Sequence, residues 1–334
     1  MNNPNLRAVL TGTGAYLPAK RLTNDDLSRM VDTSDEWIYP RTGIRSRRIA
    51  AEGENVSDMA AAAGRQALEN AGARPEEIDL LVLATITPDT PLPASSCLVQ
   101  TRLGLSNATC FDIAAACSGF IYALDVARQY VLSGAARKVL VVGAEKMSAI
   151  TDWQDRTTCI LFGDGAGAAV VEPASEGSAN GILASCTGTD GSLAPLLHIE
   201  AGGSAMPASA ETLAARKGFV RMDGHTIFKY AVRNMASIAE KAVAAAGLRP
   251  GDIDWIVPHQ ANIRIISAVA KTMSAPPEKV VANIDTTGNT TAGSIPIALD
   301  EAVRDGRVKP GDNVLFVAFG AGLTWAASVV RWGR

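Results

Sequence analysis

The stretch Ala71-Gly-Ala-Arg-Pro-Glu-Glu-Ile-Asp79 returns later in the chain as Ala246-Gly-Leu-Arg-Pro-Gly-Asp-Ile-Asp254, identical at six of nine positions and displaced by 175 residues. The same displacement maps Lys138-Val-Leu-Val-Val-Gly-Ala-Glu145 onto Asn313-Val-Leu-Phe-Val-Ala-Phe-Gly320, and Ala123-Leu-Asp125 onto Ala298-Leu-Asp300. Three matches at one offset indicate two copies of one structural unit.

Helical and strand patterns alternate within each copy. Helical periodicity runs over residues 56–71 and 226–246, and short β-branched apolar runs lie at 79–84 and 254–257. Both proposed halves, 1–174 and 175–334, open with a strand that ends in Gly-Thr, at 9–13 and 182–189. We therefore predict an α/β fold of two pseudo-twofold related halves with layered helices and mixed sheets. A single long doubly wound sheet is the alternative.

Composition and charge restrict the class of protein. The 334 residues are 47% hydrophobic and 19% charged, with a net charge of −3 and no local concentration of Lys and Arg. These values favour a compact enzyme with a small-molecule substrate over binding to nucleic acid or an anionic membrane. No apolar run reaches the 18 residues of a membrane span, and residues 1–20 lack a secretion-signal pattern, so a cytoplasmic location is expected.

The cysteines and histidines argue against a disulfide framework and a metal centre. The five cysteines are irregularly spaced without a CxxC motif, and the three histidines are scattered over the chain. We expect neither a zinc site nor any other bound metal.

Cys117 is the candidate nucleophile. It lies in Asp112-Ile-Ala-Ala-Ala-Cys-Ser-Gly-Phe120, between a short apolar stretch and a helical pattern. A thiol at the start of a helix meets the positive end of the helix dipole, which favours the reactive thiolate. Small neighbours leave room for a substrate. The alternative is an inert buried cysteine.

The 175-residue offset carries Cys117 to Ala292, inside Thr287-Gly-Asn-Thr-Thr-Ala-Gly-Ser-Ile-Pro296. If the halves pack symmetrically, the two helix starts meet and Asn289 projects its amide toward Cys117. The alternative is that Asn289 serves only as a turn residue. His259 follows the strand at 254–257, at the end where α/β sheets carry ligand-contacting residues, although a lone histidine is more often structural.

Two glycine-rich runs have different predicted roles. Gly163-Asp-Gly-Ala-Gly167 precedes a strand rather than a helix, so it fails the dinucleotide-binding pattern and is interpreted as a tight turn. Gly320-Ala-Gly322 follows a strand, and its backbone N–H groups could bind an oxyanion. A plain turn is the alternative for this second run.

Ala-Ala-Cys117-Ser-Gly-Phe, Pro-His259-Gln-Ala-Asn and Gly-Asn289-Thr-Thr-Ala-Gly-Ser-Ile-Pro occur in the order typical of one enzyme family. The chain resembles β-ketoacyl-acyl-carrier-protein synthase III, a homodimeric condensing enzyme of the thiolase fold. The resemblance extends from Thr33-Ser-Asp-Glu-Trp37 and Arg41-Thr-Gly-Ile44 to Phe319-Gly-Ala-Gly-Leu-Thr-Trp325.

This resemblance implies a reaction without an external cofactor. Cys117 would take an acyl group from acyl-coenzyme A and pass it to the carbanion formed by decarboxylation of malonyl-acyl-carrier protein, which initiates fatty acid synthesis. His259 and Asn289 would stabilise the malonyl oxyanion, and the N–H groups of Cys117 and Ala321 the other oxyanion.

The resemblance also implies binding residues. Coenzyme A would contact Trp37, Arg41, Arg156 and Asn262, and the acyl pocket would include Leu92 and Phe319. The carrier protein would meet Gln260, Ala261, Asn262, Ile263, Arg264, Lys229 and Lys271. Without the resemblance, a core aromatic and solvated surface charges would be the simpler interpretation of these residues.

Two positions depart from the family pattern. His225 stands where the family usually has Asn beside the pantetheine channel, and Leu92 stands where a partner-chain aromatic often closes the acyl pocket, so primer length stays open. An acyl-transferring relative of secondary metabolism and a non-catalytic carrier-binding subunit are the rival functions. A thiolase is disfavoured because no cysteine follows Cys186.

Overall fold

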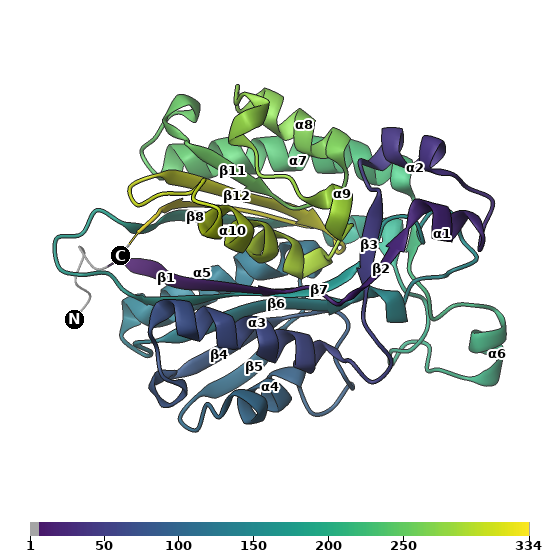
Figure 1. The fold of residues 1–334 in the computed structure, drawn as a ribbon, viewed down its shortest axis with the longest axis horizontal. Helices are drawn as coiled ribbons and strands as arrows, with labels where there is room; N and C mark the ends of the chain where they lie inside the picture. The colour runs from purple at the N-terminus through teal and green to yellow at the C-terminus, as the bar shows by residue number, and fades with distance from the viewer. Residues whose placement is uncertain (1–6, 334) are drawn as a thin grey trace.

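Two mixed β-sheets form the framework of the computed structural model, which describes residues 7–333 (Figure 1). The first sheet has the order β1 (Ala8–Tyr16), β7 (Asp164–Pro173), β6 (Val139–Lys146), β4 (Leu80–Ala84) and β5 (Thr109–Ile113). The second has the order β11 (Trp255–Pro258), β12 (Asn313–Gly320), β13 (Thr324–Arg331) and β8 (Gly181–Thr189).

The two sheets share one pairing pattern. The order β1-β7-β6-β4 corresponds to β8-β13-β12-β11, with two antiparallel pairs followed by a parallel pair in each. The strand that matches β5 is reduced to a parallel bridge between Ile256 and Val280. The predicted duplication is confirmed, and a single doubly wound sheet is excluded.

Helices cover both faces of each sheet. Figure 1 shows α3 (Val56–Ala71) and α4 (Ser95–Leu103) outside the first sheet, and α7 (Gly224–Ala245) and α8 (Ile263–Thr272) outside the second. Between the sheets lie α5 (Gly119–Ser133) and α10 (Ser294–Arg304). The result is five alternating layers of helix and sheet, in agreement with the predicted fold class.

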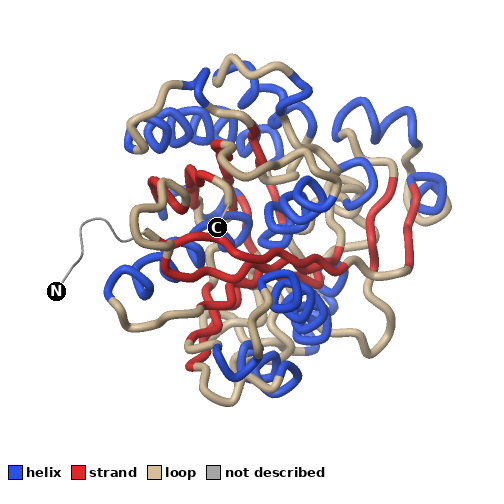
Figure 2. The backbone as a smooth tube through the Cα atoms, turned by 60° about the vertical axis from the view of Figure 1, so that its left-hand side comes forward, coloured by secondary structure: helices blue, strands red, loops and turns tan. Residues whose placement is uncertain are grey.

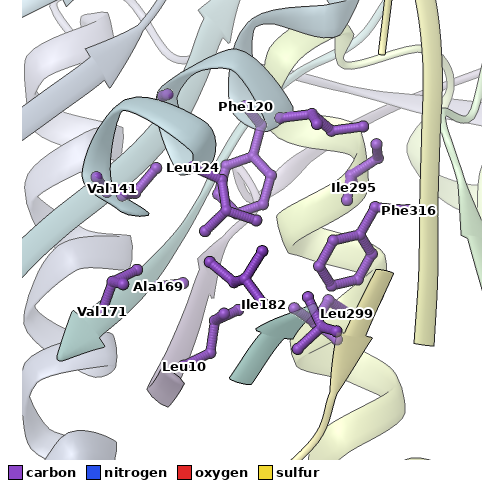
Figure 3. Close-up of a cluster of buried hydrophobic side chains, with 14 of the residues drawn as sticks. Leu10, Phe120, Leu124, Val141, Ala169, Val171, Ile182, Ile295, Leu299 and Phe316 are labelled. Atoms are coloured by element: carbon purple, nitrogen blue, oxygen red, sulfur yellow. The ribbon is translucent and has the colours of Figure 1, made fainter. Parts of the chain in front are cut away.

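Strand residues alternate between two hydrophobic cores, as the two-residue period of a strand requires. In β12, Phe316 and its neighbours at i±2 face α5 and α10, whereas Leu315 and Val317 face α7 and α8. The central cluster between the sheets joins the two halves through Phe120, Leu124, Ile295, Leu299 and Phe316 (Figure 3).

The starts of α5 and α10 meet in the middle layer, as the sequence predicts. A side chain added at Gly119 would approach the Ala292 Cβ to 3.5 Å, and one added at Gly143 would lie 2.3 Å from the Ala292 carbonyl oxygen. The helices pack this closely because glycine leaves no side chain between them and the sheet.

The prediction of a tight turn over residues 163–167 is wrong. Residues 164–167 belong to β7, where Gly167 pairs with Gly143 on one side and Ala15 on the other. The glycines serve helix packing instead, since a Cβ at Gly167 would lie 2.6 Å from the Ile297 nitrogen.

The smaller elements gather at one end of the sheets (Figures 1 and 2). They comprise the hairpin of β2 (Lys20–Thr23) and β3 (Ser46–Ile49), the pair β9 (Leu197–His198) and β10 (Arg221–Met222), and the short helices α1 (Asn24–Ser28), α2 (Asp35–Thr42), α6 (Ala210–Ala214) and α9 (Ile284–Thr287). None of the helices within residues 7–333 has the length and apolar character needed to cross a bilayer.

The connection from β7 to β8 spans residues 174–180 and contains the predicted boundary between residues 174 and 175. The division of the chain into domains at this boundary stays a prediction.

Replacing Gly167 by Ala should destabilise the protein by about 1 to 3 kcal/mol, because the new methyl group meets the backbone of α10. Urea unfolding at a fixed protein concentration measures the effect. Gly251→Ala is the matched control, since nothing lies within 4 Å of its added methyl group; it should change stability by less than about 0.5 kcal/mol. Equal effects of the two substitutions would contradict this account.

Candidate active site

Cys117 lies at the strand-to-helix junction that the sequence predicts. Strand β5 ends at Ile113, a 3₁₀ turn covers Ala116–Ser118, and α5 begins at Gly119. The same turn recurs 175 residues later as Thr291–Gly293, directly before α10. Ala116 and Thr291 both have positive φ angles, 46° and 50°, so the two helix starts share an unusual backbone conformation.

Cys117, His259 and Asn289 line one cavity of about 110 Å³. His259 directly follows β11, and Asn289 occupies the loop between α9 and α10. The other lining residues are mostly apolar or glycine: Leu161, Phe162, Leu197, Met222, Gly224, Ile227, Phe228, Ala231, Met235, Ala261, Asn262, Ile265, Phe319 and Gly320. The fold therefore brings the three predicted catalytic side chains together.

A second cavity of about 240 Å³ meets the first at Cys117. Its lining is apolar apart from His198, Thr291 and the cysteine, and consists of Ile86, Ala116, Cys117, Met147, Phe162, Leu197, His198, Ile199, Val220, Thr291 and Ala321. The volume and apolar lining suit an aliphatic group attached to the Cys117 sulfur.

Burial dominates the electrostatics of Cys117. The residue is 8% exposed, and burial raises the pKa of its thiol to about 12, with a further upward contribution from Glu145. The Thr291 hydroxyl lowers this pKa, but by less. The sequence predicts a stabilised thiolate at the helix start, whereas the enclosed site favours the neutral thiol because a buried charge loses its hydration.

His259 is neutral for the same reason. Burial alone lowers the pKa of its imidazole to about 3. Its backbone N–H donates to the Val317 carbonyl at 2.8 Å, which joins the end of β11 to β12, and its Nδ1 lies 2.7 Å from Ser294 Oγ. The ring is held on one side by α10 and lines the cavity beside Asn289.

Asn289 is fixed by three backbone contacts. Its N–H donates to the Leu161 carbonyl at 2.9 Å, and its carbonyl accepts from the Gly163 N–H at 3.0 Å. Its side-chain Oδ1 accepts from the Thr291 N–H at 2.9 Å. This bond fixes the orientation of the amide, and within residues 7–333 its only donor, Nδ2, is bonded to no acceptor.

Gly320 brings the end of β12 against the nucleophile. An added Cβ at Gly320 would lie 2.6 Å from the Cys117 nitrogen, so the backbone of β12 and that of Cys117 are in close contact. Ala321 follows at once and lines the second cavity, and the Thr324 hydroxyl bridges the Ala115 and Ala321 carbonyl oxygens at 3.1 Å each.

Three of the predicted coenzyme A residues cluster on the surface around Trp37. The guanidinium carbons of Arg41 and Arg156 lie 4.8 and 5.2 Å from the centre of its ring. Asn262 connects this cluster to the cavity, since its Nδ2 donates to the Arg41 carbonyl at 2.8 Å and its Oδ1 accepts from the Arg264 N–H at the start of α8.

One residue predicted to bind the carrier protein is wrongly assigned. Gln260 is fully buried, and its amide bonds to the carbonyl oxygens of Pro258 and Val281 and to the Asn283 N–H. No macromolecule can reach this side chain, so Gln260 is structural. Among the other predicted contacts, Lys229, Arg264 and Lys271 are exposed, and Ala261, Asn262 and Ile263 are half-buried.

The predicted acyl-pocket residues and His225 lie in different surroundings. Phe319 lines the first cavity with His259, whereas Leu92 is 86% exposed and lines neither cavity described above. His225 is exposed at the start of α7, beside the cavity residue Gly224.

Sequence reasoning missed several residues that surround the three candidates. Glu145 is fully buried and accepts hydrogen bonds from Thr85, Ile86 and Thr87, and burial raises the pKa of its carboxyl to about 8. Ser294 and Thr291 belong to the same sequence motif as Asn289, but the motif does not reveal which groups their side chains contact.

Among residues 7–333, no group of three or more His, Cys, Asp or Glu side chains could hold a metal ion.

Comparison with known proteins gives consistent matches along the chain. Residues 111–191 match the family model described as 3-oxoacyl-[acyl-carrier-protein (ACP)] synthase III, and residues 243–332 match its C-terminal counterpart. A β-ketoacyl-[acyl-carrier-protein] synthase III from Rhodospirillum centenum is 53% identical over 98% of this chain and 99% of its own length. The protein of that name from Caldanaerobacter subterraneus is 52% identical over the same shares.

A solved structure supports the same assignment. The crystal structure of 3-oxoacyl-[acyl-carrier-protein] synthase III from Aquifex aeolicus covers 97% of this chain and 100% of its own, with 49% identity and a TM-score of 0.90. Profile matches, near full-length identity and fold agree, and the chain belongs to the β-ketoacyl-[acyl-carrier-protein] synthase III family.

Proposed function

We propose that the chain is an acyltransferase that condenses an acyl-coenzyme A primer with malonyl-acyl-carrier protein. The product is a 3-oxoacyl-acyl-carrier protein, and the reaction initiates fatty acid synthesis. Family membership supports this activity. The observation that carries it is the convergence of Cys117, His259 and Asn289 on one cavity that continues into an apolar second cavity.

In the first proposed step, Cys117 takes the acyl group. A bond forms between its sulfur and the acyl carbon, the bond from that carbon to the coenzyme A sulfur breaks, and the thiol proton passes to the departing sulfur. The N–H groups of Cys117 and Ala321 stabilise the oxyanion at the acyl carbon, in this step and again when the Cys117 thioester is attacked; the contact of Gly320 with the Cys117 backbone supports this assignment. Both the starting thiol and the product thioester are uncharged, so burial favours each of them.

In the second proposed step, His259 Nε2 and Asn289 Nδ2 donate to the malonyl thioester oxygen. Loss of carbon dioxide leaves a carbanion that attacks the carbonyl carbon of the Cys117 thioester. The bond from that carbon to the Cys117 sulfur breaks, and the departing thiolate takes a proton from water to restore the thiol. The availability of Nδ2 supports this role for Asn289, since Oδ1 is occupied by the Thr291 N–H. The neutral state of His259 is compatible with a hydrogen-bond donor. The proposed steps use no cofactor.

We propose that the second cavity receives the acyl chain and that Leu92 of a partner subunit closes it in a homodimer. Leu92 is 86% exposed in one chain, although its loop is anchored. The Asp89 N–H donates to Ser95 Oγ at 2.8 Å, and Asp112 accepts the Ser95 and Ser96 N–H groups at 2.8 and 2.9 Å. A large apolar side chain on a fixed loop is suited to burial in an interface. Phe319, which the resemblance places in the acyl pocket, lines the first cavity and not the second, so we propose that it contacts the malonyl group instead.

We propose that Trp37, Arg41, Arg156 and Asn262 bind coenzyme A and that Lys229, Arg264 and Lys271 contact the carrier protein. Stacking on Trp37 between flanking guanidinium groups suits an adenine with phosphates nearby. The guanidinium carbon of Arg264 lies 5.0 Å from the centre of the ring of Phe228, which lines the first cavity, so at least this cation lies close to the proposed site. Ala261, Asn262 and Ile263 adjoin them.

The division into residues 1–174 and 175–334, and the cytoplasmic location, belong to the same proposal. In this division the first half carries the nucleophile and the second half carries His259 and Asn289.

Incubation with acyl-coenzyme A should add one acyl group to the protein, on Cys117 alone, because this cysteine joins the two cavities. Intact mass and peptide mapping measure the site, and added malonyl-acyl-carrier protein should then yield the 3-oxoacyl product. Cys159→Ala is the control, since Cys159 is buried outside both cavities and its loss should leave loading intact. Loading without condensation would favour another acceptor; no loading would support a non-catalytic subunit.

Alkylation of Cys117 by iodoacetamide should accelerate about tenfold per pH unit from pH 7 to 10 without levelling off. The thiolate fraction keeps rising while the pH stays below the thiol pKa of about 12. A free small thiol in the same series should level off above its pKa of about 8.5. A plateau for Cys117 below pH 8 would mean that the positive end of the α5 dipole lowers the thiol pKa by more than burial raises it.

Leu92→Phe should shift the enzyme toward short primers, because a larger side chain shortens the proposed pocket. The octanoyl to acetyl ratio of kcat/KM should fall at least about tenfold, since apolar fitting discriminates by roughly 1 to 3 kcal/mol per methylene. Leu213→Phe, at a leucine that is 69% exposed on α6, is the control. Both variants are assayed as verified dimers, and an unchanged ratio in Leu92→Phe removes Leu92 from the pocket.

A further inference from the structure

The hydrogen bond between His259 and Ser294 determines which ring nitrogen carries the proton. Ser294 is 1% exposed and is the first residue of α10. Its Oγ lies 2.7 Å from His259 Nδ1 and accepts the Gln260 N–H at 3.4 Å. A hydroxyl has one proton to donate, and within residues 7–333 the only candidate acceptor in hydrogen-bond contact with this one is His259 Nδ1.

The opposite tautomer would leave a buried polar group unpaired. If Nδ1 carried the proton, it would donate to Ser294 Oγ, and the serine proton would then lack an acceptor in the described part of the chain. An unpaired buried hydroxyl costs about 1 to 3 kcal/mol. The network therefore selects the tautomer with the proton on Nε2, the ring nitrogen that no described residue bonds.

The repeat provides an internal comparison for this pair. Subtracting 175 from His259 and Ser294 gives Ala84 and Gly119. These two positions are also in contact, since a Cβ added at Gly119 would lie 3.0 Å from the Ala84 Cβ. Helix α5 thus starts without a hydroxyl at this place.

Capping of α10 does not explain the serine either, because the N-cap residue is Gly293. Within the described residues the Ser294 hydroxyl contacts His259 and the Gln260 N–H instead. The serine is present in the half that contains the histidine and absent from the half that does not.

We propose that Ser294 is a positioning residue that holds His259 in the Nε2-protonated tautomer and so keeps a hydrogen-bond donor directed at the malonyl thioester. The inference rests on the proposed condensation for its kinetic consequence, but the tautomer itself is a property of the free protein. Orienting partners of active-site histidines typically contribute tenfold to a hundredfold to activity where they support metal ligands, and an effect of this size is expected here.

Nitrogen-15 spectra of histidine-labelled protein test the tautomer without substrate. The chain has three histidines, so His259→Gln identifies the resonances of His259. The wild type should show a single neutral tautomer with the proton on Nε2 from pH 5 to 8. Ser294→Ala should show averaged or exchanged nitrogen shifts, and Ser294→Thr, which keeps a hydroxyl, should restore the wild-type pattern.

Kinetics provide the second measurement. Ser294→Ala should lower malonyl decarboxylation by about tenfold to a hundredfold while loading of Cys117 changes less than about threefold, with Ser294→Thr recovering most of the loss. Ser328→Ala is the control for removing a buried, hydrogen-bonded serine hydroxyl, since Ser328 bonds Ser185 and Ala184 and lines neither cavity.

The outcomes separate the two proposals. An unchanged His259 tautomer in a folded Ser294→Ala protein overturns the positioning role, whatever the enzyme's substrate. Should Ser294→Thr fail to fold, the Ser294→Ala spectrum still decides the question. If Ser294→Ala changes the tautomer but the wild-type protein does not condense malonyl-acyl-carrier protein, the proposed function is overturned and the positioning role stands.

Discussion

The contact between the starts of α5 and α10 is the constraint on which the rest of the structure depends. Both helices are enclosed between the two sheets, and their first turns meet where Gly143 and Gly167 leave no side chain in the way. This close approach positions Cys117 from one half beside the loop of Asn289 from the other. A methyl group at either glycine would meet the backbone at or just before α10. The geometry of the site therefore depends on the packing of the core.

Enclosure also determines the charge state of the site. Burial raises the pKa of the Cys117 thiol and lowers that of the His259 imidazole, so both groups are neutral near pH 7. Such a site carries no fixed charge of its own at these positions and offers oriented dipoles where negative charge develops during the reaction. Donors held in place before the reaction need no reorganisation, which is the main way that proteins stabilise oxyanions.

The two copies of the repeated unit carry different side chains at equivalent positions around the site. The turn before α5 carries Cys117, whereas the equivalent turn before α10 carries Ala292. Conversely, the end of β11 carries His259 where the end of β4 carries Ala84. The proposed nucleophile and the proposed histidine donor thus each have an alanine at the equivalent position of the other half, and these small residues allow the two helix starts to pack together.

The sequence by itself determined the two-unit α/β architecture, because a 175-residue repeat and the period of its apolar residues survive without knowledge of any contact. It also predicted that Cys117, His259 and Asn289 meet, and the structure brings all three to one cavity; their catalytic roles belong to the proposal. Only the tertiary structure decided the role of Gln260, the second cavity, the neutral state of Cys117 and the bond from Ser294 to His259. These depend on which groups lose water and which distant segments meet, and neither burial nor contact is encoded in a local pattern.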